Sequence, residues 1–167
     1  MAIHTTAGTD EQYAVFGVGT EVFGLDIGLI ESLIPTPPIR PIPGAPDHVV
    51  GVTSLRGRAV PVISLRRRLE RPDASAEEAD QRIIVVVLDG QAIGLLVDSV
   101  SEVIEIAPER IQPPSPVLGP EAMRYVSGVA QDGERLIVLL NAAELLSGDE
   151  QAALRRVAEA AAAEAAA

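Results

Sequence analysis

The sequence predicts an all-β protein built from two small barrels. An internal repeat, turn residues between short apolar runs and an aliphatic composition together support this fold class. Hydrophobic residues make up 47% of the 167 residues, whereas aromatic residues make up only 2%. Val, Ile and Leu therefore have to form the core, and β-branched side chains favour strands.

The repeat is the most informative of these observations. Residues 22–34 (VFGLDIGLIESLI) match residues 92–104 (AIGLLVDSVSEVI) at a constant offset of 70 positions, and the glycine in the third position is shared. Residues 51–52 and 128–129 form a second Gly-Val pair of the same kind. A chain with two similar β units has a seam between them, and we expect the function to lie at that seam.

Turn residues divide each repeat into hairpins. Asp89-Gly90 lies between two apolar runs, and this dipeptide favours the type I′ turn of a hairpin. Gly19-Thr20 has the corresponding place in the first repeat, and each repeat ends with a further hairpin, at Arg56-Gly57 and at Asp132-Gly133. A Pro-rich stretch between the two hairpins predicts a stiff, extended link. About five short strands in each repeat then favour closure into a barrel, which removes exposed edges.

These elements define the expected domain organisation. Residues 13–71 are expected to form the first barrel and residues 82–140 the second, with short connecting helices. Residues 1–11 are polar and are expected to be disordered. Residues 72–81 have the composition of an exposed linker. The folded domain is thus expected to span residues 12–147.

The C-terminal residues 148–167 predict an Ala-rich helix. Ser147 and Glu150 have the spacing of a capping box, in which each side chain accepts a hydrogen bond from the backbone N–H of the other residue. Leu154 and Val157 are the best core residues of this segment. The helix is therefore either a marginal tail or an element that docks weakly on the barrels.

Charge limits the possible partners. The net charge is −11, and every basic residue is Arg. An acidic chain is repelled by phosphate backbones and anionic lipid, so neither nucleic-acid binding nor insertion into membranes is expected. We see no apolar run near the ~20 residues that span a bilayer and no secretory signal, which favours a cytoplasmic protein. Six arginines within residues 56–71 form either a solvated turn and helix end or a patch for an acidic protein partner.

Catalytic residues are scarce. The chain has only His4 and His48, with no Cys and no Lys, which argues against thiolate metal sites, P-loops and Schiff bases. One enzymatic alternative is an aspartic-type hydrolase, in which duplicated β units each supply one carboxylate. The candidates Asp26 and Asp98 do not align, and neither lies in an Asp-Thr/Ser-Gly turn. We therefore expect no enzyme, no cofactor and no metal.

Five motifs resemble those of one protein family. They are FGLDI (23–27), GVTSLRG (51–57), VPVISL (60–65), GLLVD (94–98) and YVSGV (125–129). In this order and at this spacing they are similar to the CheW-type coupling domain of bacterial chemotaxis. The similarity extends over about Glu11 to Leu146, which is nearly the whole of the expected folded domain.

This resemblance implies two five-stranded SH3-like barrels and a non-enzymatic adaptor. Members of the family couple the cytoplasmic tips of chemoreceptors to the regulatory domain of the histidine kinase CheA, which is itself CheW-like, and rings of such domains hold membrane-associated arrays together. A CheW-like scaffold of another chemosensory pathway, such as twitching motility or development, is the alternative. Outside signalling, a peptide- or RNA-binding barrel pair is the rival, although the charge and the few aromatics disfavour RNA.

The resemblance also implies binding residues. The expected receptor-binding residues are Ile30, Leu33, Arg56, Val100 and Val103. Ordinary core packing is the alternative for the four apolar residues, and a simple turn position is the alternative for the arginine. The expected kinase-binding residues are Gly51, Gly57, Val62 and Leu65.

Overall fold

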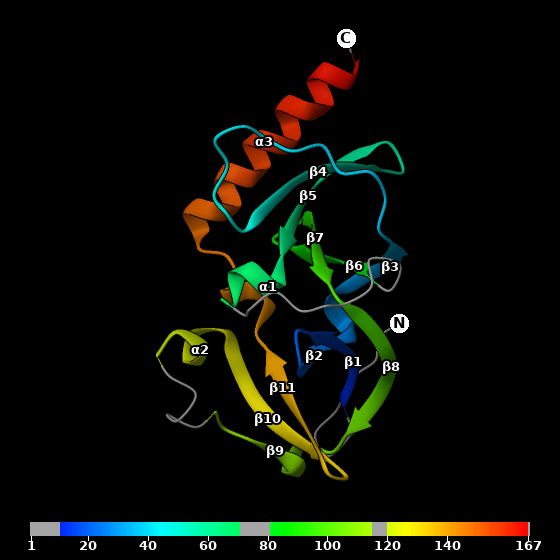
Figure 1. The fold of residues 1–167 in the computed structure, drawn as a ribbon, viewed down its shortest axis with the longest axis vertical. Coiled ribbons are helices and arrows are strands. Elements are labelled where there is room, and N and C mark those ends of the chain that lie inside the picture. Colours follow the sequence, from blue (N-terminus) through cyan, green and yellow to red (C-terminus); the bar gives the residue numbers. More distant parts are fainter. Residues whose placement is uncertain (1–10, 71–80, 115–119, 167) are drawn as a thin grey trace.

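The structure is a computed structural model that describes residues 11–70, 81–114 and 120–166. It consists of two mostly antiparallel sheets, which stand one above the other in Figure 1. The expected disordered N-terminus and the expected linker lie outside the described residues, apart from Glu11 and Gln81 at their ends. Glu11 is the first residue of strand β1.

The lower sheet, which we name barrel A, has the strand order β8-β1-β2-β11-β10-β9. Its strands are β1 (Glu11–Val18), β2 (Glu21–Asp26), β8 (Ser99–Ile106), β9 (Ile111–Gln112), β10 (Val126–Asp132) and β11 (Arg135–Leu140). The upper sheet, barrel B, has the order β3-β6-β7-β5-β4. Its strands are β3 (Ile30–Pro35), β4 (Val49–Leu55), β5 (Arg58–Ser64), β6 (Arg82–Leu88) and β7 (Gln91–Val97).

Helices connect these strands and end the chain. They are η1 (Ile27–Leu29), α1 (Leu65–Arg68), η3 (Pro108–Arg110), α2 (Pro120–Tyr125), η5 (Ala142–Glu144) and α3 (Gly148–Ala166). The predicted fold class, two SH3-like barrels with short connecting helices and a C-terminal helix, is confirmed. Barrel A has a sixth strand because the short β9 pairs with β10.

The two repeats exchange their first hairpins. Barrel A combines β1 and β2 of the first repeat with β8 to β11 of the second, and barrel B combines β6 and β7 with β3 to β5. Parallel pairing of β2 with β11 and of β7 with β5 joins the exchanged hairpins to their barrels. The predicted boundaries, 13–71 and 82–140, are therefore wrong. Turn residues identify a hairpin from the sequence, but they do not say which other strand its outer edge will meet.

Glycines shared by the repeats lie where backbones approach closely. A Cβ atom on Gly51 would lie 2.1 Å from the carbonyl oxygen of Arg40, and one on Gly128 would lie 3.0 Å from that of Gln112. At both places the chain segment that leads into the glycine's strand pairs with that strand. In barrel B it pairs with β4 through the Arg40–Val52 bridge, and in barrel A it forms β9, which pairs with β10. The repeated Gly-Val pair therefore serves barrel closure.

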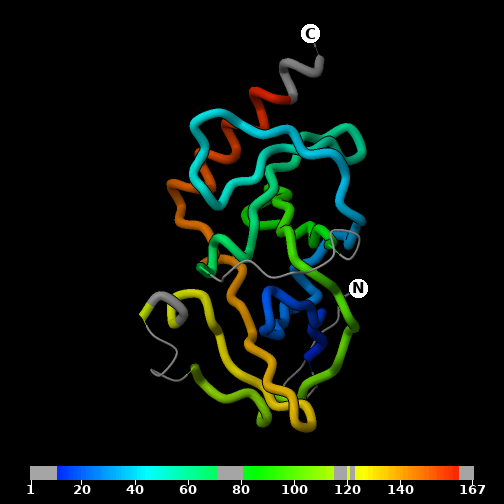
Figure 2. The backbone as a smooth tube through the Cα atoms, in the orientation of Figure 1, coloured from blue at the N-terminus to red at the C-terminus, as the bar shows by residue number. Residues whose placement is uncertain are grey.

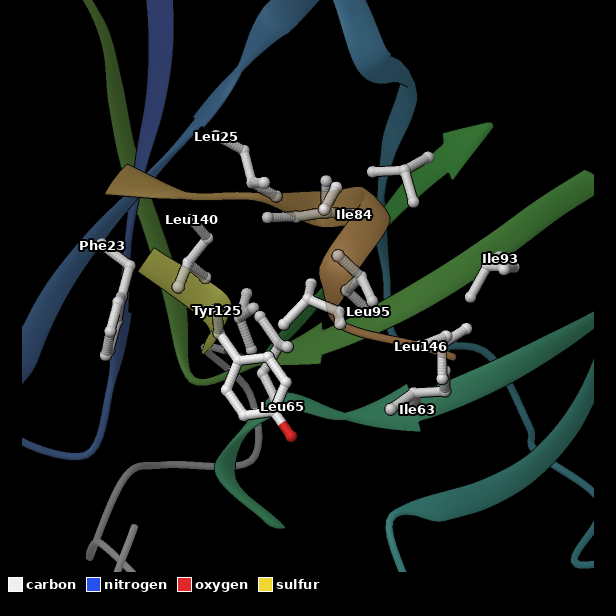
Figure 3. Packing of buried hydrophobic residues seen from close by; sticks show 14 of the residues in the cluster. Phe23, Leu25, Ile63, Leu65, Ile84, Ile93, Leu95, Tyr125, Leu140 and Leu146 are labelled. Carbon is white, nitrogen blue, oxygen red and sulfur yellow. The ribbon is translucent and has the colours of Figure 1, made fainter. Parts of the chain in front are cut away.

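Three hydrophobic clusters hold the fold together. A small cluster around Ile137 lies in barrel A, and another around Ile83 lies in barrel B. The largest cluster contains side chains from both barrels, among them Leu25 and Ile84, and Figure 3 shows these two gathered with their neighbours. The seam between the barrels is thus a packed core, and any surface for a partner has to lie at its rim.

Helix α3 docks on this core through its first half. The predicted capping box is confirmed, because Ser147 Oγ accepts a hydrogen bond from the Glu150 N–H (3.1 Å) and Glu150 Oε1 accepts one from the Ser147 N–H (2.8 Å). Leu154 is only 5% exposed and belongs to the shared cluster. The helix then runs along barrel B to the C-terminus (Figures 1 and 2).

We predict that Gly51→Ala lowers the free energy of unfolding by about 3 kcal/mol, because the new methyl group would overlap the backbone of the Arg40 link and neither can move cheaply. Urea denaturation monitored by circular dichroism measures this change. Gly148→Ala is the matched control, since a Cβ atom there meets nothing within 4 Å. Equal stability of the two variants would contradict the proposed role of Gly51.

Candidate partner-binding surfaces

Four of the predicted receptor-binding residues lie on the edge strands of the barrels. Ile30 and Leu33 belong to β3, whereas Val100 and Val103 occupy equivalent positions on β8. Both strands lie on the right of the view in Figure 1, on either side of the seam. The structure thus brings Ile30 and Val100, the equivalent residues of the two repeats, to the rim of the shared core, and it places Leu33 and Val103 three residues further along the same strands.

Burial divides these residues into two pairs. Ile30 and Val100 are half-buried and pack against the shared core, so part of their contact is internal packing. Leu33 and Val103 are 43% and 53% exposed. Because their large apolar side chains are exposed on both edge strands, Leu33 and Val103 are stronger candidates for contact with a partner than Ile30 and Val100.

An ion pair ties the late hairpin of each barrel to its edge strand. In barrel B, Arg58 at the start of β5 pairs with Glu31 of β3. In barrel A, Arg135 at the start of β11 pairs with Glu102 of β8, at 2.8 Å. The hairpin turn that carries Arg56 is therefore held beside β3.

Arg56 has an unusual backbone conformation for its residue type. Its φ is 51° and that of Gly57 is 78°, which matches a type I′ turn, where Asn, Asp or Gly normally occupies the first central position. Its side chain is exposed, and no hydrogen bond or ion pair holds it among the described residues. A strained arginine that supports nothing in the fold points to a role outside the fold.

The predicted kinase-binding residues are only partly at the surface. Gly57 is exposed in the hairpin turn, but Gly51 is buried beneath the Arg40 link. Val62 and Leu65 are 0% exposed, so the prediction that their side chains bind a partner is wrong. The physical reason is that β5 lies between β4 and β7 inside the sheet and leads directly into the shared core.

The arginines of α1 are engaged within the protein. Arg66 pairs with Asp98, and Arg67 donates to the backbone carbonyl of Asp47 (3.1 Å). Arg68 pairs with Glu150 (2.8 Å) and donates to the carbonyl of Leu145. This part of the predicted basic patch therefore stabilises the fold and is not a free surface for an acidic partner. Arg71 lies outside the described residues.

The two aspartates of the hydrolase alternative have separate structural roles. Asp98 is buried, accepts a hydrogen bond from the Gly19 N–H (2.6 Å) and pairs with Arg66. Asp26 is exposed and caps η1 by accepting from the Gly28 N–H (2.8 Å). Neither arrangement is that of two carboxylates sharing a proton. Within the described ranges, no group of three or more His, Cys, Asp or Glu side chains could hold a metal ion.

Comparison with known proteins agrees with this architecture. A family model described as "CheW-like domain" matches residues 12–150. The chain belongs to the CheW-like domain family. The matched segment includes both barrels and the start of α3, and it ends where the Ala-rich part of the helix begins.

Similar proteins occur in several bacteria. The chemotaxis protein CheW of Klebsiella aerogenes is 32% identical over 150 residues, which cover 89% of both chains. Protein FrzA of Myxococcus xanthus is 29% identical over 157 residues, covering 93% of this chain and 97% of FrzA. The crystal structure of the scaffolding protein TtCheW from Thermoanaerobacter tengcongensis matches with a TM-score of 0.77 and 33% identity, over 84% of this chain and 95% of TtCheW.

Sequence reasoning missed three further exposed apolar side chains among the described residues, one of which is Leu136 of β11. Leu29 of η1 and Val87 of β6 are both exposed, and η1 packs against β6 next to the start of β3. The repeat offered a signal for the first of them, because Leu29 aligns with the polar Ser99. In the part of the chain that the structure describes, no helix has the length and apolar character needed to cross a membrane.

A charged cluster connects α3 to the body of the protein. His48 Nε2 lies 3.5 Å from Glu150 Oε2, and Arg68 binds the same carboxylate. Burial and the nearby Arg68 charge lower the pKa of His48, against the opposing effect of Glu150 and Asp47. Burial alone would raise the pKa of Glu150, but the hydrogen bonds from Ser147 and the charges of Arg68 and His48 outweigh it, so the pKa is lowered.

The hollow beside this cluster has mixed charge. It has a volume of about 440 Å³ and lies between α1, α2 and the start of α3. Arginines and carboxylates line it in equal number, and the ring of Tyr125 lies 5.3 Å from the guanidinium groups of both Arg68 and Arg124. The arrangement favours no single class of ligand.

We predict that acidification destabilises this junction in two stages. The folded-state pKa of His48 lies below its ordinary value of 6.5, so the unfolded chain binds the additional proton first and the free energy of unfolding decreases as the pH falls below about 6.5. The lowered pKa of Glu150 adds a further loss as the pH falls below about 4.5. Urea denaturation between pH 8 and about pH 3 measures both stages.

His48→Gln is the matched variant for this prediction, because glutamine keeps a polar side chain that does not titrate. It should remove the first decrease and leave the second. An unchanged pH dependence of the variant down to about pH 5 would show that His48 does not cause the first stage.

Proposed function

We propose that this CheW-like protein is a non-enzymatic scaffold that couples the cytoplasmic tips of chemoreceptors to the regulatory domain of the histidine kinase CheA. The observation that carries the proposal is the pair of equivalent edge strands, β3 and β8, whose exposed Leu33 and Val103 flank a packed seam. The relatives named chemotaxis protein CheW and the scaffolding protein TtCheW support the same function.

The receptor would contact the rim of the seam. An amphipathic helical tip presents apolar side chains along one stripe, and such a stripe fits apolar residues spaced along a shallow surface. Leu33 and Val103 offer exposed apolar area, and the half-buried Ile30 and Val100 form the base between them and the shared core. Because that core is solid, this surface is fixed before binding, which lowers the entropic cost of association.

The kinase would contact the β4–β5 hairpin of barrel B. Gly57 and Arg56 are exposed there, and the Arg58–Glu31 pair fixes the hairpin on β3. Gly51, Val62 and Leu65 would support this surface from inside the barrel. The protein would act in the cytoplasm and join membrane-associated arrays through its partners, with other CheW-like domains as additional neighbours.

A scaffold of another chemosensory pathway is the second candidate. Protein FrzA of Myxococcus xanthus matches nearly the whole chain at an identity close to that of the CheW relatives. The geometry of the edge strands serves this alternative equally. Binding assays with receptor tips from different pathways of the source organism would separate the two candidates.

We predict that Val103→Asp weakens binding to a chemoreceptor tip by at least about tenfold, because a carboxylate would replace an exposed apolar contact. Binding to the CheA regulatory domain should stay unchanged. The test is a reconstituted mixture of receptor, kinase and this protein, with titration calorimetry for each pair. Leu136→Asp is the control, since Leu136 is 60% exposed on β11 of the same barrel. If both variants couple like the wild type, β8 is not the receptor-binding strand.

We predict that Arg56→Ala lowers affinity for the receptor tip or the CheA domain by about tenfold, as expected for an arginine at the centre of an interface. Its stability should not fall, because the side chain supports nothing in the described part of the fold. Arg110→Ala provides the matched control, since Arg110 is another exposed arginine, in η3. Unchanged affinity for both partners would refute the assignment of Arg56.

A further inference from the structure

Two exposed apolar side chains occupy neighbouring positions in barrel B, at the start of β3. Leu29 directly precedes Ile30, which pairs with Val86 of β6 (Figure 1). Because these strands are antiparallel, the residue before Ile30 lies beside the residue after Val86, which is Val87. Helix η1, which ends at Leu29, packs against β6. Leu29 and Val87 are 37% and 38% exposed, and we name them the Leu29–Val87 pair.

The repeat shows what a barrel requires at this place. In barrel A, Phe16 pairs with Val100, and the next pair along the two strands is Gly17 with Ser99. These are the positions equivalent to Val87 and Leu29 at the offset of 70 that relates the repeats. A Cβ atom on Gly17 would lie only 2.9 Å from Ser99 Oγ. Barrel A thus has small residues here, and an apolar pair is not a requirement of the barrel.

The Leu29–Val87 pair takes no part in the cores of the protein. Val86 is 0% exposed and belongs to the shared cluster, whereas Val87, the next residue of the strand, points to the opposite side of the sheet. The three hydrophobic clusters of the described residues contain neither Leu29 nor Val87. Single exposed apolar residues are common on protein surfaces, but two neighbouring ones that no core uses indicate a contact with another molecule.

The surroundings of the pair belong to the proposed receptor-binding surface. Leu33 follows Leu29 by four positions and is itself exposed on β3. Glu31, between them, pairs with Arg58 and so holds the β4–β5 hairpin beside β3. The turn of that hairpin carries the exposed Arg56. A partner that covers the start of β3 would therefore meet apolar side chains bordered by an arginine, a composition that is common at the centre of protein interfaces.

Area and charge argue against a second copy of this chain as the occupant. Two side chains that are each less than two-fifths exposed cannot supply the ~1,200 Å² that a specific interface buries. The net charge of −11 also opposes the association of two copies. A chemoreceptor tip avoids both difficulties, because the rest of its contact area comes from the β3 and β8 surface that the proposed function already assigns to it.

We propose that the Leu29–Val87 pair is a further contact for the apolar stripe of a chemoreceptor tip, present on the barrel B side of the seam only. This inference rests on the proposed scaffold function and adds two residues to its receptor-binding surface. Gly17 and Ser99, the equivalent residues of barrel A, offer no apolar side chain. The receptor-binding surface is therefore unequal on the two sides of the seam, although the repeats are alike at Ile30 and Val100.

The test replaces the pair with serine, which barrel A has at the position equivalent to Leu29. Titration calorimetry with a chemoreceptor tip should show about threefold weaker binding for Leu29→Ser and for Val87→Ser, and about tenfold weaker binding for the double variant. Binding to the CheA regulatory domain should stay unchanged. Circular dichroism checks that each variant folds, and the two single variants carry the test if the double variant does not.

Leu136→Ser is the matched control, since Leu136 is an exposed apolar residue on β11 of barrel A. It should bind the tip like the wild type. Equal loss of affinity in this control and in the serine variants of the pair would show that any exposed apolar residue has the same effect, and would overturn the assignment to the pair.

The outcomes separate this surface from the proposed function. If the wild type does not bind the tip, the scaffold function and the Leu29–Val87 contact both fail. If the wild type binds and the serine variants bind equally well, the contact alone is refuted. Weaker binding to the CheA domain with unchanged binding to the tip would assign the pair to the kinase. A wild-type dimer that the serine variants dissociate, with unchanged binding to the tip, would assign it to self-association, and either result overturns the proposal.

Discussion

The hydrophobic cluster shared by the two barrels is the constraint on which the rest of the structure depends. It forms because each barrel takes its first hairpin from the opposite repeat, through the parallel pairs of β2 with β11 and β7 with β5. Leu25 and Ile84, from different barrels, therefore pack in the same core. Separating the barrels would expose this core to water, at about 25 cal/mol for each Å² of apolar surface. The edge strands β3 and β8 are consequently fixed relative to each other.

Polar contacts of Asp98 at the border of this core, which we name the Asp98 latch, fix the relative orientation of the barrels. Asp98, directly after β7 of barrel B, receives a hydrogen bond from Gly19 in the β1–β2 turn of barrel A and pairs with Arg66. Buried ion pairs contribute little net stability, because desolvation offsets the attraction between the charges. Their directionality is more useful here, because hydrogen bonds constrain the angle between donor and acceptor more strictly than apolar contacts do. The apolar core thus supplies the stability and the latch selects one geometry.

The sequence predicted local features well and long-range partners poorly, and particular residues show why. The Ser147–Glu150 capping box and the turn at Asp89-Gly90 depend on neighbours within three positions, so their residue types sufficed. The exchange of hairpins, the burial of Val62 and the pairing of Arg66 with Asp98 depend on strands that meet from distant parts of the chain. An apolar run such as that of β5 has the same sequence pattern whether the strand lies at a binding surface or in the interior of the sheet. The resemblance to a family did not show which of these two places Val62 occupies.

Differences between equivalent positions of the two repeats separate function from fold. The barrel needs a glycine at Gly51 and at Gly128, and both repeats have it because the backbone of a preceding segment approaches the strand closely there. It does not need an arginine at position 56, because the pairing of Leu55 with Arg58 and of Asp132 with Arg135 makes Gly133 the equivalent first turn residue, and Gly133 has a similar positive φ of 65°. Barrel A folds without an arginine at this turn position. The arginine of barrel B, in a backbone conformation unfavourable for its residue type, is therefore not needed for folding. This asymmetry supports the proposal that Arg56 contacts another molecule.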